Sequence, residues 1–149
     1  MTIERAIPTD HDVLTAITKR SKAYWGYSQE QLQEWDALLT VTPEYITNTE
    51  TYKLVSEGVA IGYYSVFMAD PQTLKLDNLF IVPEFISKGF GKKLMEHLFE
   101  KAALYKCSAI LLDSDPNAES FYSRFGFVTI GQIENAHKTR FLPVMKKSL

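Results

Sequence analysis

The chain has 149 residues, 46% of them hydrophobic and 23% charged, with a formal net charge of −2 at pH 7. Such values are typical of one globular domain, so we expect a single domain over residues 1–149. The slightly acidic balance argues against general nucleic-acid binding, and no apolar run approaches the roughly 20 residues that cross a bilayer, which argues against a membrane protein.

The N-terminal part reads as a strand followed by helices. Residues 3–7 form a short β-prone run that ends at Pro8, and they lack the basic segment and apolar core of a signal peptide. We therefore expect a cytoplasmic protein. Asp10 is placed to cap a helix that runs to about residue 22. Its expected apolar face consists of Val13, Leu14 and Ile17.

An aromatic loop and further helices follow. Tyr24, Trp25 and Tyr27 crowd around Gly26 in the loop at residues 23–27. A capping-box pattern at residues 28–31 then predicts a second helix. The apolar positions of this helix are Leu32, Trp35, Leu38 and Leu39. Thr42-Pro43-Glu44 starts another helical turn, with proline in a favoured early position.

The rest of the chain alternates strands and helices. Residues 52–56 and 59–68 read as a hairpin around Glu57-Gly58, and residues 74–82 as a third strand. The later expected elements are a helix at 89–105, a strand at 109–112, a helix at 116–125 stopped by Gly126, and strands at 127–133 and 139–145. Cys107, the one cysteine, fits a buried structural thiol. This mixed order predicts an α/β or α+β fold.

The junction between the third strand and the long helix is the strongest functional signal. After Pro83 the chain runs through Lys88, Gly89, Phe90, Gly91, Lys92 and Lys93 into the helix. Helix N-termini present unpaired N–H groups that bind phosphates, and glycine lets the backbone approach a ligand closely. The loop reads as a pyrophosphate cradle, and a plain strand-to-helix connection is the alternative. The P-loop and dinucleotide-binding fingerprints both fail here, because Lys93 and Leu94 stand where those motifs need Ser/Thr and Gly.

This arrangement resembles the GCN5-related N-acetyltransferase (GNAT) family over nearly the whole chain. The family has a strand ending in Val-x-Pro and then Arg/Gln-x-x-Gly-x-Gly/Ala, and Val82, Gly89 and Gly91 fit that pattern. Two positions depart from it, because Ile86 replaces Arg/Gln and Ser87 replaces the usual glycine. The resemblance implies a mixed, mostly antiparallel central sheet with a β-α-β core for coenzyme A and flanking helices.

A second motif lies about 30 residues further on. Many members carry Asn-x-x-Ala-x-x-x-Tyr-x-x-x-Gly-Phe, and Ala118, Tyr122, Gly126 and Phe127 fall on this pattern. Asp115 stands at the Asn position. The resemblance implies that Tyr122 faces the thioester sulfur and protonates the leaving thiolate. A tyrosine packed into the core is the alternative.

The resemblance implies acetyl-CoA as donor, without a metal, and a primary amine of a small molecule or peptide as acceptor. The backbone of Leu79, Phe80, Ile81 and Val82 would bind the pantetheine arm as an added strand. Asn117 would bond the same arm or cap its helix, and Asp115 is expected to cap that helix. Asp77 is the candidate base, with a rim carboxylate as the alternative.

The acceptor would lie against Tyr24, Trp25 and Tyr27, whose aromatic rings suit an apolar or cationic group; a lid over the core is the alternative. Should these rings prove structural, residues 134–138 are the next acceptor candidate. His11, His97 and His137 are expected to be surface or capping residues. The alternative to an enzyme is a CoA-binding regulatory module of the same fold, and a homodimer is left open.

Overall fold

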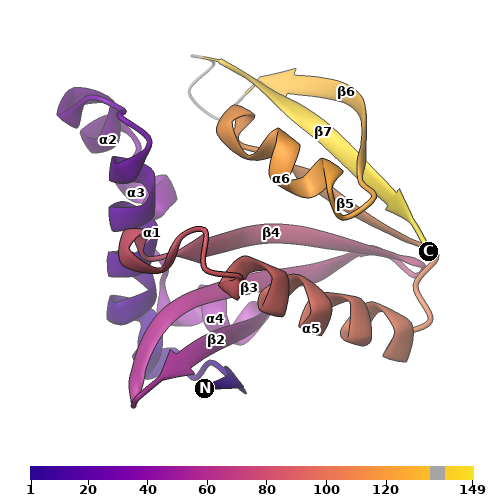
Figure 1. Ribbon diagram of the computed structural model, residues 1–149, viewed down its shortest axis with the longest axis horizontal. Helices are drawn as coiled ribbons and strands as arrows, with labels where there is room; N and C mark the ends of the chain where they lie inside the picture. The colour runs from indigo at the N-terminus through magenta and orange to yellow at the C-terminus, as the bar shows by residue number, and fades with distance from the viewer. Residues whose placement is uncertain (135–139) are drawn as a thin grey trace. The chain divides into compact units, whose positions relative to one another are not determined.

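The computed structural model describes residues 1–134 and 140–149 (Figure 1). These residues form two compact units, Met1–Val66 with Asn78–Phe99 (unit 1) and Phe67–Asp77 with Glu100–Leu149 (unit 2). A single domain over residues 1–149 stays a prediction. No helix among the described residues is long and apolar enough to cross a membrane.

Unit 1 carries most of the helices. It contains β1 (Thr2–Arg5), α1 (His11–Tyr24), α2 (Gln29–Glu34), α3 (Asp36–Leu39), α4 (Pro43–Asn48) and β2 (Glu50–Ser56). Three elements run through both units: β3 (Val59–Asp70), β4 (Thr73–Ile81) and α5 (Phe90–Leu104). Unit 2 adds β5 (Ala109–Asp113), α6 (Glu119–Ser123), β6 (Val128–Glu134) and β7 (Phe141–Ser148). Single 3-10 turns occur at Pro8–Asp10, Pro83–Phe85 and Pro116–Ala118.

The strands of the described residues follow the order β1-β2-β3-β4-β5-β7-β6. Pairing is antiparallel in β1–β2, β2–β3, β5–β7 and β6–β7, and parallel in β4–β5. The chain between β4 and β5 contains α5, as a parallel connection requires. These features confirm the predicted mixed, mostly antiparallel sheet with flanking helices.

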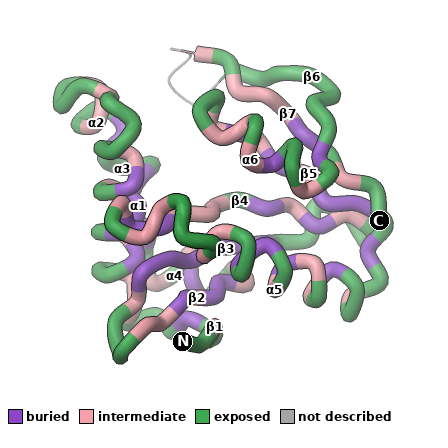
Figure 2. Tube along the Cα trace, in the orientation of Figure 1, coloured by how far each residue is buried: buried purple, intermediate pink, exposed green. Residues whose placement is uncertain are grey.

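The core of unit 1 lies on both faces of β2 and β3, which Figure 2 shows as largely buried. Successive strand residues point to opposite faces. Accordingly the buried Tyr63 hydroxyl bonds the Thr18 hydroxyl of α1 at 2.5 Å, whereas the Tyr64 hydroxyl bonds Nδ1 of His97 on α5 at 2.6 Å. α1 therefore covers one face of these strands and α5 the other.

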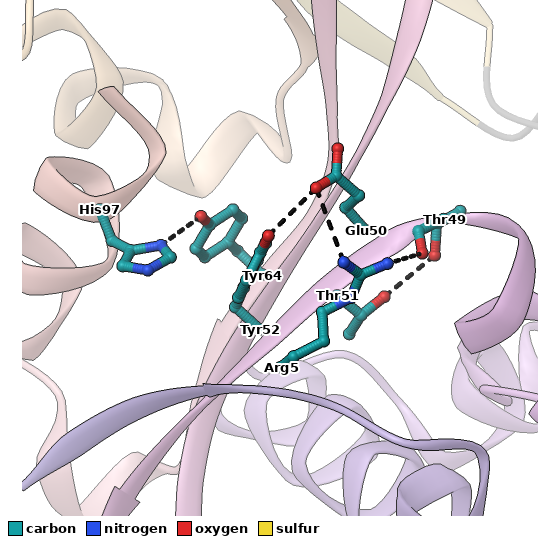
Figure 3. A network of polar contacts seen from close by, with 7 residues as sticks. All are labelled: Arg5, Thr49, Glu50, Thr51, Tyr52, Tyr64 and His97. Atoms are coloured by element: carbon teal, nitrogen blue, oxygen red, sulfur yellow. Dashed lines mark hydrogen bonds and ion pairs between the residues drawn. The ribbon is translucent and has the colours of Figure 1, made fainter. Parts of the chain in front are cut away.

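A polar network continues from His97 along β2 (Figure 3). The Tyr52 ring stacks on Tyr64 with centroids 5.4 Å apart and lies 4.8 Å from the His97 ring. The Tyr52 hydroxyl donates to Glu50 at 3.0 Å, and Arg5 pairs with the same carboxylate at 3.7 Å. The expectation that His97 is a surface or capping residue is therefore wrong: its ring is half-buried among tyrosines. His11 begins α1 beside Asp12, and His137 lies outside the described residues.

Several predicted helix details differ from the structure. α1 reaches Tyr24, and Val13 is 36% exposed although Leu14 and Ile17 are buried. The Asp10 carboxylate accepts from the Ile7 N–H at 2.9 Å and does not cap α1 through its side chain.

The predicted second helix also differs in part. It breaks at the buried Trp35 into α2 and α3, which leaves Leu38 56% exposed. The Ser28 half of the capping box is present, because its hydroxyl accepts from the Gln31 N–H at 3.0 Å. The Gln31 side chain instead donates to Glu34 at 3.4 Å.

The remaining element predictions hold with shifted ends. The β2–β3 hairpin turns at Glu57 and Gly58, both at positive φ (51° and 78°). β4 and β5 start and end within one residue of the prediction. The expected helix at 116–125 is a 3-10 turn followed by the shorter α6, and β7 continues to Ser148. The predicted start of the last strand at residue 139 lies outside the described residues.

Candidate functional site

The loop between β4 and α5 has a backbone shape set by two residues at positive φ. Ser87 has φ 63° and Gly89 has φ 85°. A Cβ built on Gly89 would meet nothing within 4 Å, so the side of the backbone that a side chain would cover is open. Phe90 then begins α5, and its ring lies 5.4 Å from that of Phe85.

The N–H groups of this loop are the feature that suits an anion. The first helical bond of α5 runs from the Lys93 N–H to the Gly89 carbonyl, at 3.3 Å. Within the described part of the chain, the N–H groups of residues 87–92 have no hydrogen-bond acceptor. A run of unpaired N–H groups at the positive end of a helix dipole favours phosphate oxygens. The predicted cradle residues Lys88, Gly89, Phe90, Gly91 and Lys92 therefore lie together with the required donors.

The three lysines of the loop differ in their surroundings. The Lys88 ammonium lies 5.7 Å over the Phe85 ring, and Lys92 is 3.9 Å from Glu96 one turn along the helix. Lys88, Lys92 and Lys93 are all exposed. Exposed side chains of this kind are worth little to folding, so their charges are available to a ligand.

Ser87 predicts a gain in stability on replacement by glycine. A non-glycine residue in the left-handed region costs about 1–2 kcal/mol, and glycine loses about 0.4–1 kcal/mol through the unfolded state. We expect Ser87→Gly to raise the free energy of unfolding by about 0.5–1 kcal/mol, as measured by urea denaturation. Lys88→Gly is the control, because Lys88 has no positive φ and should only lose stability. Equal losses in both variants would contradict the prediction.

The end of β4 offers part of the expected pantetheine strand. The pairs of β4 with β5 end at Leu76↔Leu112, so Leu79, Phe80 and Ile81 lie beyond that ladder. On the β3 side, Gly62 packs so closely that a Cβ would lie 2.9 Å from the Phe80 carbonyl oxygen. The Val82 N–H donates to the Ile61 carbonyl at 2.9 Å, which leaves Val82 without a backbone donor for a ligand.

The predicted aromatic residues divide into an exposed pair and a packed ring. Tyr24 and Trp25 are 53% and 43% exposed and meet edge to face at 5.1 Å. Tyr27 instead packs on the buried Trp35, with centroids 4.9 Å apart. The core-lid interpretation therefore applies to Tyr27, whereas the other two rings are open to solvent.

Lys22 joins the donor and acceptor candidates of unit 1. Its ammonium lies 5.9 Å from the Tyr27 and Trp35 ring centroids and 5.7 Å from that of Phe80. Three rings around one cation form a favourable cation–π environment. The sequence gave no motif for Lys22, whose spacing from Tyr27 and Phe80 is visible only in the fold.

A groove of about 370 Å³ lies between α1, α2 and α3. Its lining is Lys19, Arg20, Ala23, Gln29, Leu32, Gln33, Asp36 and Leu39. Lys19 and Asp36 pair across it at 2.6 Å. None of the predicted acceptor aromatics lines this groove, although Ala23 is the neighbour of Tyr24.

Tyr122 lies in unit 2 on α6, a helix of five residues. It is 8% exposed, and its ring contacts those of Phe121 and Phe127 at 5.1 and 5.9 Å. Gly126, at φ 90°, ends the helix: the Phe127 N–H bonds the Tyr122 carbonyl and the Gly126 N–H that of Ser123, which is a Schellman motif.

The acidity of the Tyr122 phenol follows from these surroundings. Burial raises its pKa well above the usual value, and the Asp115 carboxylate raises it further. The hydroxyl makes no hydrogen bond within the described residues, so its proton is available to a ligand. The phenol is thus a protonated donor throughout the neutral range.

The other candidates of unit 2 are Asn117 and Asp77. The Asp115 carboxylate accepts from the Asn117 N–H at 2.9 Å and from its side-chain amide at 3.0 Å, which confirms Asp115 as a cap. Asp77 is exposed on β4. No cluster of three or more His, Cys, Asp or Glu able to hold a metal occurs among residues 1–134 and 140–149.

The candidates thus fall into two sets. Unit 1 holds the cradle, the end of β4 and the aromatic residues, and unit 2 holds Tyr122, Asn117 and Asp77. Part of the second-choice acceptor segment, residues 134–138, lies outside the described residues. Besides Lys22, the sequence gave no signal for Arg140, which pairs with Asp115 at 3.4 Å.

Sequence comparison places this chain beside acetyltransferases. The acetyltransferase (GNAT) domain family matches residues 25–149. A spermine/spermidine N(1)-acetyltransferase from Bacillus subtilis is 34% identical over 92 residues, which is 54% of this chain and 60% of the relative. The chain is therefore matched to less than two thirds of that relative's length.

Solved structures share the fold. A GCN5-related N-acetyltransferase from Rhodopseudomonas palustris superposes with a TM-score of 0.83 at 22% identity, covering 99% of this chain and 95% of the other. The PaiA N-acetyltransferase from Thermoplasma acidophilum, solved in complex with coenzyme A, gives 0.80 at 18% identity and full coverage of both chains. With its family match over most of its length and this shared fold, the chain belongs to the GNAT acetyltransferase family.

Proposed function

We propose that the protein is an acetyl-CoA-dependent N-acetyltransferase acting on a primary amine of a small molecule or peptide. The observation that carries the proposal is the run of N–H groups at residues 87–92 without acceptors in the described chain. This run lies at the loop-to-helix junction whose sequence resembles the family's pyrophosphate loop. Ser87 keeps the left-handed backbone there, so its departure from glycine leaves the loop shape intact. The departure at Ile86 removes only a side-chain contact.

The chemistry is direct attack. The neutral amine nitrogen bonds the thioester carbonyl carbon, the C–S bond breaks, and the sulfur leaves as thiolate. Tyr122 donates its proton to that sulfur, and a base takes the proton that the amine nitrogen loses. Asp77 is our candidate for that base, because it is an exposed carboxylate on the strand that continues into Leu79–Ile81.

The proposal extends to two points of cellular context. We expect the protein to act in the cytoplasm, where acetyl-CoA is made available to such enzymes. A homodimer is the alternative to a monomer, and sedimentation of the purified chain decides between them.

Thiol release from acetyl-CoA, measured against a panel of amines, tests the proposed function. The panel contains amino acids, polyamines, aminoglycosides and peptide N-termini, and spermine and spermidine are included because the Bacillus relative is named for them. Acetyl-CoA and CoA should both raise the melting temperature, since they share the pyrophosphate. Binding without thiol release across the panel would favour the CoA-binding regulatory module, and absence of binding would refute both.

The exposed aromatic residue Trp25 predicts a change in acceptor recognition. We expect Trp25→Ala to raise the acceptor KM about tenfold with little change in the acetyl-CoA KM, as the loss of one cation–π or packing contact of about 1–2 kcal/mol implies. Tyr27→Ala should raise the acceptor KM and also lower the melting temperature, because Tyr27 packs on Trp35. Steady-state kinetics with each substrate varied provides the measurement.

Leu38→Ala is the matched control for this prediction. Leu38 is an exposed apolar residue of unit 1 outside the aromatic cluster, so its loss should leave both KM values unchanged. An unchanged acceptor KM in Trp25→Ala would instead place the acceptor elsewhere, with the α1–α2–α3 groove as the next surface to test.

A further inference from the structure

Arg140, at the entrance to β7, forms an ion pair with Asp115. Its Nη2 lies 3.4 Å from Oδ2 of Asp115, and the two side chains are only 22% and 13% exposed. Both residues belong to unit 2. A charge pair this sheltered from water is felt by its neighbours more strongly than a surface pair would be.

The Asp115 carboxylate in turn shapes the turn that leads to Tyr122. One oxygen, Oδ1, accepts from the backbone N–H and the side-chain amide of Asn117, and Oδ2 faces Arg140. The Asp115 carbonyl accepts from the Ala118 N–H at 2.8 Å, which closes the 3-10 turn. α6 starts at the next residue, so Asp115 fixes the N-terminal approach to Tyr122 and Gly126 fixes its C-terminal end.

We infer that Arg140 is a positioning residue for Tyr122: it holds the Asp115 carboxylate at the head of the α6 turn and compensates that carboxylate's charge near the phenol. The inference rests on the proposed function, in which Tyr122 protonates the leaving thiolate. Arg140 thus acts on the reaction through Asp115 and contacts no reacting atom.

The charges around α6 make the direction of the effect clear. Asp115 is the charged group that raises the pKa of Tyr122, after burial. The other charged side chains near α6 have separate contacts: Glu119 with the Thr129 hydroxyl, Arg124 over the Phe121 ring, and Lys147 with the Phe125 carbonyl. Loss of Arg140 would leave Asp115 uncompensated, which raises the pKa of the phenol further and makes it a weaker proton donor.

A double-variant cycle separates charge compensation from simple anchoring. The variants are Arg140→Gln, Asp115→Asn and the combination of both, with Arg140→Lys as the conservative replacement. A nearby charge shifts a pKa by one or more units, so we expect Arg140→Gln to lower kcat about tenfold with the acetyl-CoA KM nearly unchanged. Arg140→Lys should retain most of kcat. The double variant, which has no buried charge, should recover most of the loss.

Lys75→Gln is the matched control. Lys75 pairs with Asp113 at 2.9 Å in the same unit, and the two side chains are 21% and 26% exposed, but the pair has no contact with the turn before α6. We expect Lys75→Gln to lower the melting temperature as Arg140→Gln does, while the double variant and Lys75→Gln both keep a kcat close to wild type.

The outcomes distinguish the inference from the proposed function. A double variant no better than Arg140→Gln, or an unchanged kcat in Arg140→Gln, overturns the inference while leaving the role of Tyr122 in place. An unchanged kcat in Tyr122→Phe, with chemistry shown to be limiting, overturns both. Should Arg140→Gln fail to fold, Arg140→Lys and the double variant still decide: loss of kcat in both overturns the inference, and retention in both supports it.

Discussion

Replacing Tyr122 by Phe should lower kcat by about 10²–10⁴-fold and leave the CoA dissociation constant nearly unchanged. The phenol acts on charge that develops only as the thiolate leaves, so its loss raises the barrier more than it weakens ground-state binding. The ring contacts of Tyr122 with Phe121 and Phe127 do not involve the hydroxyl, so Phe should keep the packing. Single-turnover acetyl transfer and CoA titration provide the two measurements.

Tyr64→Phe is the control for this prediction. The Tyr64 hydroxyl is also buried, but it bonds His97 at 2.6 Å on the covered face of β3 (Figure 3). We expect this variant to lose stability, by about 1–3 kcal/mol for the unpaired imidazole, and to keep its turnover. If Tyr122→Phe behaved as Tyr64→Phe does, Tyr122 would be a core residue.

The raised pKa of Tyr122 gives the proposal a pH signature. The group must be protonated to act, and its pKa in the folded protein lies above the usual phenol value of about 10. Turnover by this donor is therefore present at neutral pH and persists as the pH rises through the ordinary phenol range. A kcat that fell with an apparent pKa near 9 would require a different donor or a titrating base.

Gly89→Val should abolish the thermal stabilisation by CoA. Binding at a hundredfold excess over Kd contributes about 2.7 kcal/mol to wild type, and a side chain at Gly89 would occupy the open side of the cradle. Valine is also strained at φ 85°, so the apo variant melts lower. The relevant measurement is the difference in melting temperature with and without CoA for each variant.

Gly58→Val is the matched control, because Gly58 has a similar φ of 78° and an equally open Cβ position in the β2–β3 hairpin. This variant should suffer the same strain and keep the full CoA shift. A CoA shift retained in Gly89→Val would move the pyrophosphate away from the β4–α5 loop.

The sequence predicted best where local chemistry decides the structure. Glu57-Gly58 located the hairpin because its backbone needs positive φ, and the apolar stripe of α5 is buried at Leu94, Met95 and Leu98 as its spacing requires. The helix around Trp35 was predicted as continuous, since the periodicity runs through it. Burial of the indole against Tyr27 breaks that helix, and this contact is tertiary.

The candidate site follows the same division. The cradle could be read from glycine spacing, because N–H exposure at a helix start is a local property. Lys22, His97 and Arg140 escaped notice because their partners lie 5, 33 and 25 or more positions away in the chain. Side chains that gain their role from distant partners carry no short-range signal.

The path of the chain through the two units limits how the protein can be taken apart. Each unit is built from two separate stretches, and β3, β4 and α5 pass from one to the other without a linker. A single cut therefore releases neither unit, and a gene segment that encodes one continuous stretch cannot transplant the cradle together with all of its supporting strands. Exchange of donor or acceptor preferences between relatives should accordingly proceed by point substitutions, and chimaeras joined within β3 or β4 should be poorly expressed.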